Sequence, residues 1–234
     1  MKRLGKLLLL AALGAPVGVA AKQPVVVELF TAQGCSSCGK VDVSVGQLAD
    51  QPGILVLTWP VDYWDYLGWK DTLAKPEFTT RQRDYDRRFG LRDVYTPQVI
   101  VDGRLQGSGA PKAVEVMIGE ARRMRTDPPD MALLNNGRIA VGSGPRPRGG
   151  GDVWLVRYDP HTVSTEVKGG DNRGQMVAER DVVHELDRLG SWNGRPVILK
   201  SPAASEPGLA SLFVVQGANG GKILGALEAD EAKP

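Results

Sequence analysis

The first half of the chain alternates between short apolar runs and amphipathic segments. Two β-branched apolar runs, residues 25–30 and 54–59, predict buried strands. Between them, apolar side chains recur at helical spacing from Val41 to Ala49, and a Pro52-Gly53 turn precedes the second run. A strand, a helix and a strand in about 35 residues predict a βαβ unit with parallel strands.

A long connection, residues 60–95, follows and predicts an inserted helix. Pro76 suits a first helical turn, and Gly90 suits a C-terminal cap. Arginines alternate with aspartates on this helix, which predicts a solvated face; they are Arg81, Arg83, Arg87 and Arg88, beside Asp84 and Asp86. A hairpin over residues 98–106 and an amphipathic helix over residues 114–124 complete the first half.

The second half predicts short strands separated by Gly, Asn and Pro. The strand candidates are residues 131–134, 138–141, 153–158, 163–167, 196–200, 212–216 and 222–227. Residues 182–189 fit a helix or a strand equally well. Such a series favours an antiparallel β-sandwich or barrel. We therefore expect two domains in the mature chain, residues 22–127 and a β-rich C-terminal domain, residues 128–234.

The N-terminal residues 1–21 have the pattern of a secretory signal peptide. Lys2, Arg3 and Lys6 precede a short apolar run that ends in small residues at Ala20 and Ala21. We therefore expect a periplasmic or secreted protein that keeps no membrane anchor after cleavage.

Composition excludes several classes of protein. Of the 234 residues, 42% are hydrophobic and 24% are charged, which is unlike a disordered chain. The 29 Lys and Arg face 27 Asp and Glu, and removing the three signal cations leaves 26. A nearly neutral mature chain gives no reason to expect a nucleic-acid partner.

The chain has only two cysteines, Cys35 and Cys38, spaced C-x-x-C where the first strand leads into the first helix. A helix N-terminus stabilises a thiolate, which is the nucleophile of disulfide exchange. Cys38 is then placed to resolve a mixed disulfide formed by Cys35. An inert disulfide and a metal clip are the alternatives, but His161 and His184 lie in the other half, so we expect no metal and no cofactor.

Two further features lie close to this motif in the predicted strand order. Thr96-Pro97 stands directly before the strand that begins at Gln98, where a cis bond would expose backbone for an extended peptide. Half of the Trp and Tyr residues fall within eleven positions; they are Trp59, Tyr63, Trp64, Tyr66 and Trp69. They either form a small core for the insert or line a groove beside the dithiol, with Trp64 and Asp62 contacting the partner.

The C-x-x-C, the βαβ-ββα order and Thr96-Pro97 together resemble a thioredoxin fold. More narrowly, the chain resembles the exported thioredoxin-like bacterial family known as domain of unknown function 1223. Five strings carry this resemblance: VELFTAQGCSSC (residues 27–38), VDYWDYLGWKD (61–71), VYTPQVIVDGR (94–104), DVVHELDRLGSWNG (181–194) and GKILGAL (221–227). The resemblance implies a thioredoxin-like α/β domain with a helical insert, followed by a β-rich domain.

Three positions depart from these families. Gly39 follows Cys38 where the resembled family usually has proline, and Pro60 stands where it usually has histidine. Thioredoxins carry a buried aspartate six residues before the first cysteine, and Leu29 stands there. The base that assists thioredoxins has no evident counterpart in this sequence.

These features predict a thiol–disulfide oxidoreductase that acts on protein thiols and disulfides in the exported compartment. Cys35 would attack, Cys38 would resolve, and Thr96, Pro97, Asp62 and Trp64 would form the docking site. One alternative is a carrier that holds Cu(I) between the two thiolates. Another is a non-catalytic interaction module on a thioredoxin scaffold.

Overall fold

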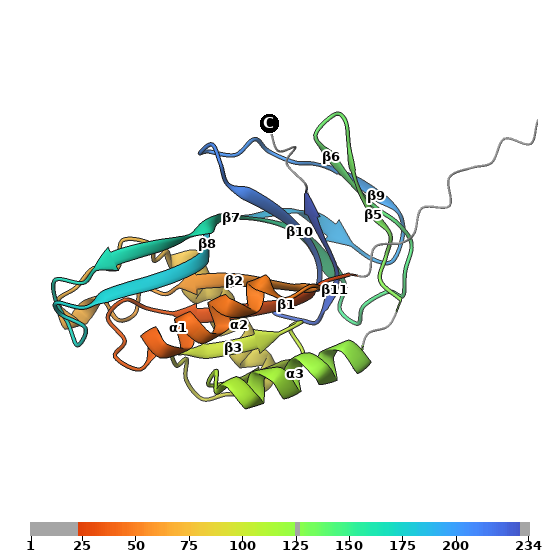
Figure 1. Cartoon of the computed structure of the whole chain (residues 1–234). Helices are drawn as coiled ribbons and strands as arrows, with labels where there is room; N and C mark the ends of the chain where they lie inside the picture. The colour runs from red at the N-terminus through yellow and green to blue at the C-terminus, as the bar shows by residue number, and fades with distance from the viewer. Residues whose placement is uncertain (1–22, 125–126, 230–234) are drawn as a thin grey trace, which may run out of the picture.

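The computed structural model describes residues 23–124 and 127–229, which form a mixed α/β structure (Figure 1). Within these residues, a large sheet has eight strands in the order β11-β10-β7-β8-β2-β1-β3-β4, and a small sheet has three in the order β5-β6-β9. The predicted signal segment, residues 1–21, lies outside the described residues.

The first half provides one end of the large sheet and the α-helices. Its elements are β1 (Val25–Thr31), α1 (Cys38–Gly46), η1 (Gln47–Asp50), β2 (Ile54–Pro60), η2 (Asp65–Leu67), α2 (Pro76–Phe89), β3 (Gln98–Val101), β4 (Leu105–Gly107) and α3 (Pro111–Met124). The predicted βαβ unit is confirmed, because β1 and β2 pair in parallel. β3 then pairs antiparallel with β1, and β4 with β3.

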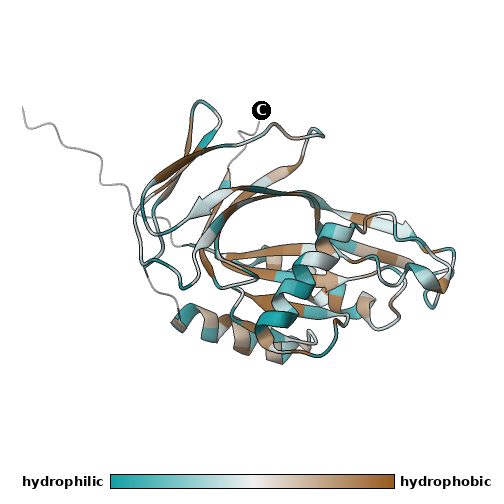
Figure 2. Ribbon diagram, turned by 180° about the vertical axis from the view of Figure 1, so that it is seen from behind, coloured by the Kyte–Doolittle hydropathy of each residue, from teal (hydrophilic) through white to brown (hydrophobic). Residues whose placement is uncertain are grey.

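β1 and β2 are buried along their whole length, because α1 and α3 cover one face while α2 and strands of the second half cover the other. Successive strand side chains point to opposite faces, so each strand contributes to two apolar clusters. The first cluster packs against α2 and includes Val26, Phe30, Trp59, Phe78 and Tyr85. The second packs against α1 and α3 and includes Val25, Val27, Leu29, Val45, Val114 and Ile118. Figure 2 shows these strands as the most hydrophobic part of the first half.

The second half is β-rich, as predicted. Its strands are β5 (Met131–Leu134), β6 (Arg138–Val141), β7 (Gly151–Glu166), β8 (Met176–Trp192), β9 (Val197–Lys200), β10 (Ala210–Gly217) and β11 (Ile223–Ala229). Residues 182–189 are strand, as part of β8. A third apolar cluster joins the small sheet to the large one and includes Ile139, Val141, Leu155, Trp192 and Phe213.

The large sheet continues from the first half into the second. β8 pairs with β2 at a single position, Thr58↔Val182, and the Thr58 hydroxyl donates to the carbonyl of Arg180 at 2.6 Å. The four long strands of the second half therefore extend the sheet of the first instead of closing on themselves. The expected boundary near residue 127 falls between α3 and β5, and a division into two domains stays a prediction.

The outer part of the β7–β8 hairpin, residues 159–182, is called the outer hairpin below. It reaches the end of the molecule where β1 leads into α1 (Figure 1). Its strands pair regularly from Thr162↔Arg180 to Glu166↔Met176, and the register shifts at its base, between Asp159 and Thr162. This hairpin brings residues of the second half to the cysteine motif.

A buried ion pair links the sheet to α2. Arg81 is 7% exposed, and its Nε lies 2.7 Å from Oε1 of Glu28, which is fully buried on β1. The Arg81 guanidinium also donates to Gln216 of β10 at 3.2 Å and lies over the ring of Trp59. The solvated face expected for the α2 arginines is therefore wrong for Arg81, because its charge is compensated inside the protein.

Removing Arg81 should cost far more stability than removing a surface arginine of the same helix. Arg81→Ala leaves Glu28 buried without its cation, and we expect a loss of about 3–5 kcal/mol in the free energy of unfolding. Arg87 is 68% exposed, so Arg87→Ala should change that free energy by less than about 0.5 kcal/mol. Urea denaturation of both variants measures the difference, and equal losses would contradict the assigned role of the ion pair.

Candidate functional site

The two cysteines lie directly after the carboxyl end of β1 and are joined as a disulfide. Two successive turns lead from β1 into α1, with Cys35 N–H donating to Ala32 O at 3.0 Å and Cys38 N–H donating to Cys35 O at 3.1 Å. This short path holds the two Cα atoms 5.4 Å apart, which suits a disulfide bridge. The segment from Ala32 to Cys38 is called the dithiol loop below.

Cys35 lies one turn earlier than the sequence predicted. α1 begins at Cys38 with Ser37 at its N-cap, so Cys35 belongs to the turn before the helix. The Ser37 hydroxyl oxygen lies 3.4 Å from Cys35 Sγ, within hydrogen-bond distance. A hydroxyl in this place can donate to a thiolate.

Three of the four expected docking residues are connected to one another near the end of β1. The Thr96–Pro97 bond is cis and precedes β3, whose Gln98 pairs with Phe30 near the end of β1. Nε1 of Trp64 donates to Oγ1 of Thr96 at 2.8 Å. Trp64 also lies beside Gly34, where an added Cβ would be 3.6 Å from the Trp64 Cβ. Trp64 and Thr96 therefore meet at the side of the loop.

Asp62 is placed differently from the other three. Its carboxylate accepts a hydrogen bond from the Thr79 hydroxyl at 2.6 Å, and its backbone N–H donates to the Thr79 hydroxyl oxygen at 3.3 Å. These contacts connect Asp62 to the first turns of α2. The five clustered Trp and Tyr residues, 59–69, also differ in their surroundings. Trp59 is fully buried in the core, while Tyr66 is 79% exposed.

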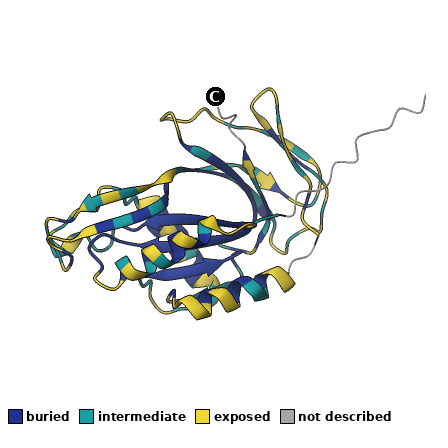
Figure 3. Cartoon of the chain, in the orientation of Figure 1, coloured by how far each residue is buried: buried dark blue, intermediate teal, exposed yellow. Residues whose placement is uncertain are grey.

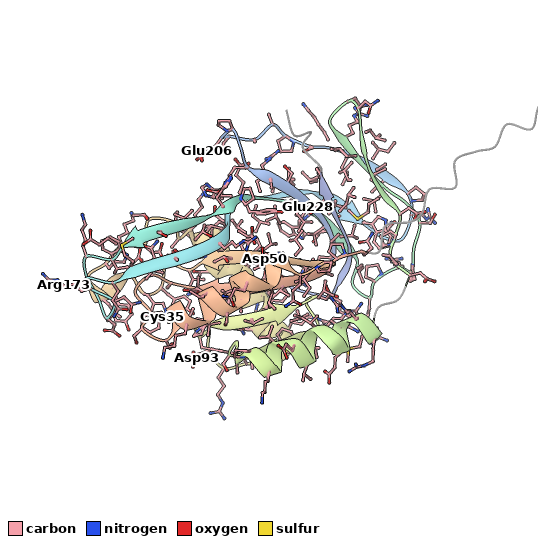
Figure 4. The ribbon with its side chains drawn as sticks, viewed as in Figure 1. Cys35, Asp50, Asp93, Arg173, Glu206 and Glu228 are labelled. Atoms are coloured by element: carbon pink, nitrogen blue, oxygen red, sulfur yellow. A yellow bond between two sulfur atoms is a disulfide. The ribbon has the colours of Figure 1, made fainter. Side chains whose placement is uncertain are left out.

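Both cysteines are only 1% exposed. The tip of the outer hairpin lies against the dithiol loop, where the side-chain amide of Asn172 donates to Gln33 O at 2.8 Å and to Cys35 O at 3.0 Å. Figure 4 shows Cys35 and the neighbouring hairpin residue Arg173 at the same end of the molecule. The loop that holds the disulfide is thus contacted by a segment that is 137 residues away from Cys35 in sequence.

Three buried carboxyl groups lie beside the dithiol loop, and the sequence did not reveal them as a group. They are Asp42 on α1, Asp71 in the segment before α2, and Glu179 on the outer hairpin. Gln33 connects two of them: its backbone N–H donates to Asp71 Oδ2 at 2.8 Å and its side-chain amide to Glu179 Oε2 at 3.2 Å. Thr31 donates to Asp42 Oδ1 at 2.6 Å.

Burial without a compensating cation raises the pKa of each group. The pKa of Asp42 rises to about 7, first through burial and then through the charge of Asp71, against the hydrogen bond from Thr31. The pKa of Glu179 rises to about 8 through burial and through the charges of Asp71 and Asp42, against the hydrogen bond from Gln33. Burial also raises the pKa of Asp71. Near neutral pH Glu179 is therefore mostly protonated and Asp42 about half protonated, while the pKa of Asp71 is shifted in the same direction.

One oxygen of Asp42 and one of Glu179 are left without hydrogen-bond partners. Within the part of the chain that the structure describes, Asp42 Oδ2 and Glu179 Oε1 are buried and accept no hydrogen bond. No group of three or more His, Cys, Asp or Glu side chains among these same residues is arranged to hold a metal ion. The cluster can therefore take up protons, and its geometry is not that of a cation site.

Comparison with known proteins shows the family of this chain. Residues 26–216 match the family described as "Protein of unknown function (DUF1223)", and the chain belongs to that family. A crystal structure of an Agrobacterium tumefaciens protein is similar, with 30% identity, a TM-score of 0.72, and coverage of 92% of this chain and 99% of the other. No curated protein matches.

A more distant similarity exists to HBP35 of Porphyromonas gingivalis. Identity is 15%, the TM-score is 0.56, and the match covers 91% of this chain and 77% of that one. A likeness at this level of identity concerns the fold alone.

The buried carboxyl groups predict a fall in stability with rising pH. The folded-state pKa of Glu179 lies above its unfolded value of 4.5, so the folded state binds more protons between that pH and about 8. The free energy of unfolding should therefore fall across this interval, by about 1.4 kcal/mol for each unit of pKa difference. Glu179→Gln should match the wild type near the lower limit and exceed its stability by a few kcal/mol above the upper one.

Urea denaturation of both proteins at several pH values measures this effect. Asp181 is a useful comparison, because burial also raises its pKa, to about 7, outside the dithiol loop. Its contribution should remain in Glu179→Gln and disappear in Asp181→Asn. Parallel stability curves for wild type and Glu179→Gln would contradict the assignment.

Proposed function

We propose that this protein is an exported thiol–disulfide oxidoreductase of thioredoxin type. The observation that carries the proposal is the Cys35–Cys38 disulfide directly after the carboxyl end of β1, with Trp64 beside Gly34 of the same loop and hydrogen-bonded to Thr96, which precedes the cis Pro97. The order β1-α1-β2-α2-β3-β4-α3, with β1 and β2 parallel and β3 and β4 antiparallel, supports the thioredoxin-like assignment. A dithiol that closes within one turn suits reversible exchange better than structural bracing, because its loop is too short to restrict the unfolded chain much.

The proposed exchange assigns a separate role to each cysteine. In reduction of a partner, the Cys35 thiolate attacks one sulfur of the partner disulfide, forms a mixed disulfide and expels the other partner sulfur as a thiolate. The Cys38 thiolate then attacks Cys35 Sγ, the second partner thiolate leaves, and the Cys35–Cys38 disulfide forms. Two electrons pass to the partner, whose two thiolates take up protons. Oxidation of a partner dithiol runs through the same steps in reverse.

The proposed compartment follows from the same chemistry. Disulfides persist in oxidising compartments such as the periplasm, and the basic and apolar pattern of residues 1–21 suits export. Within the described residues, no helix is long and apolar enough to cross a membrane. The proposed partners are therefore exported proteins with thiols or disulfides.

An exchange assay with purified protein tests the proposal. The wild type should reduce insulin disulfides, or oxidise a dithiol peptide, at a rate that Cys35→Ser lowers to background, because the attacking sulfur is lost. Cys38→Ser should accumulate a mixed disulfide with the partner, since the resolving thiol is missing. Ser36→Ala is a matched control, because Ser36 is exposed and the variant retains both cysteines.

The direction of the reaction follows from the reduction potential of the Cys35–Cys38 pair, measured against a glutathione buffer. If wild type and Cys35→Ser are equally inactive in both directions, the oxidoreductase proposal is wrong.

A further inference from the structure

The disulfide is covered in a way that conflicts with direct attack by a protein. Each cysteine is 1% exposed, and a protein partner must reach a sulfur atom to exchange with it. On one side the loop is flanked by Trp64, which belongs to the first half. The outer hairpin, which belongs to the second half, also contacts the loop, through Asn172 and Glu179. One of these segments must move before exchange with a protein can occur.

The contacts between the outer hairpin and the dithiol loop are mainly polar. Asn172 donates to the carbonyls of Gln33 and Cys35, and the Gln33 amide donates to Glu179. Outside the dithiol loop, the backbone of Gly169 at the tip lies against that of Gly68, the residue that follows η2, where a Cβ added at Gly169 would come within 2.4 Å of the Gly68 oxygen. Polar contacts of this kind can be exchanged for contacts with water at small net cost.

The outer hairpin has few buried apolar side chains. Between Asp159 and Glu166 its side chains are exposed or half-buried, in contrast to the fully buried β1 and β2 (Figure 3). Its buried apolar residues are Val167, Val177 and Val182, and Arg180 at its base pairs with Asp50. Segments with few buried apolar side chains open locally at lower free energy than the core. Trp64 differs, because it packs against the first apolar cluster and donates to Thr96. The hairpin is therefore the segment more readily displaced.

A structural irregularity lies where the outer hairpin joins the sheet. The pairing register of β7 and β8 shifts between Asp159 and Thr162, and Asp181 has a φ of 53°, which is uncommon for a residue other than glycine. The regular sheet resumes only beyond this point, where Val182 pairs with Thr58. Such an interruption allows the outer hairpin to change its angle without breaking the sheet.

Glu179 lies on the inner side of this hairpin, among groups of its own sign. Asp42 of α1 and Asp71 of the segment before α2 repel it, while Gln33 donates to it. Arg180, the neighbouring cation, pairs with Asp50 at 2.9 Å. Closure of the hairpin therefore places a carboxyl group where, among residues 23–124 and 127–229, no cation pairs with its ionised form.

We propose that the outer hairpin is a lid over the Cys35–Cys38 disulfide, held shut by Asn172 and released when Glu179 ionises. The lid regulates the exchange site described above, and its biological meaning rests on that proposed function. Protonated Glu179 is tolerated under the closed lid. Ionised Glu179 is repelled by Asp42 and Asp71 and gains hydration when the lid opens. The second half of the chain thereby controls the chemistry of the first.

The rate at which tris(2-carboxyethyl)phosphine reduces the disulfide tests the lid. The phosphine attacks one sulfur, the S–S bond breaks, and water converts the adduct into phosphine oxide and two thiols. Rates are divided by those of an unfolded peptide containing the same C-S-S-C disulfide at the same pH. Asn172→Ala removes two hydrogen bonds that hold the lid and should raise the relative rate by about tenfold. Asp171→Ala is the matched control, since Asp171 is exposed on the same tip.

The pH dependence tests the role of Glu179. The relative rate for the wild type should rise between about pH 6 and about pH 9, as Glu179 ionises and the lid opens. In Glu179→Gln it should stay low and nearly constant, because the side chain at that position no longer ionises. Asn172→Asp is a second variant at this position, and the two Asn172 variants are called the latch variants below. It keeps the size of the side chain but removes both donated hydrogen bonds. Urea denaturation confirms that each variant is folded.

Two results would overturn the lid. One is equal relative rates for Asn172→Ala, Asn172→Asp and Asp171→Ala in folded protein. The other is a Glu179→Gln profile that rises with pH as the wild-type profile does.

The measurement does not depend on exchange with proteins. If the latch variants react faster with phosphine but none exchanges with insulin, the lid stands and the oxidoreductase proposal fails. If the wild type exchanges rapidly and the latch variants react no faster than the control, the lid fails and the oxidoreductase proposal stands.

Discussion

The joint between β2 and β8 determines how the rest of the molecule is arranged. Thr58 pairs with Val182, and its hydroxyl donates to the carbonyl of Arg180. Because β8 is also one strand of the outer hairpin, this single contact fixes where the hairpin leaves the sheet. Gly46 of α1 fits the same constraint, since an added Cβ would lie 3.4 Å from the Arg180 Cβ. A weak helix-forming residue is therefore accepted where the hairpin passes closely over α1.

Buried carboxyl groups occur in two places, and their charge is balanced by a cation in only one of them. Glu28 is fully buried but paired with Arg81, so its charge is balanced where it lies. Asp42 and Glu179 are equally buried, have no adjacent cation, and each keeps one oxygen without a partner among the described residues. The first arrangement makes the link between β1, α2 and β10 rigid. In the proposed lid, the second makes the contact between the dithiol loop and the outer hairpin depend on the protonation of Glu179.

The sequence predicted the parts of the fold that depend on local pattern. The buried runs of β1 and β2, the cysteine motif between them and the Thr96-Pro97 step are visible because strand and turn preferences act over a few residues. The carboxyl cluster depends on long-range packing. Asp42 follows Cys38 by one helical turn, which is a weak signal, but Glu179 reaches Gln33 across 146 residues. Arg81 was misjudged for the same reason, because its partner Glu28 lies 53 residues away on another element.

The cluster also bears on the reactivity of the sulfurs under a closed hairpin. A thiolate is favoured by nearby positive charge and by water, and it is disfavoured by burial and by nearby negative charge. Asp42 lies one helical turn beyond Cys38, so under a closed hairpin the dithiol is buried and, once Asp42 ionises, also close to a negative charge. Opening of the proposed lid would hydrate the sulfurs and the carboxyl groups together. Access and thiol acidity would then change in one step, and a thiol pKa measured on the whole chain would report the position of the hairpin as much as the intrinsic chemistry of Cys35.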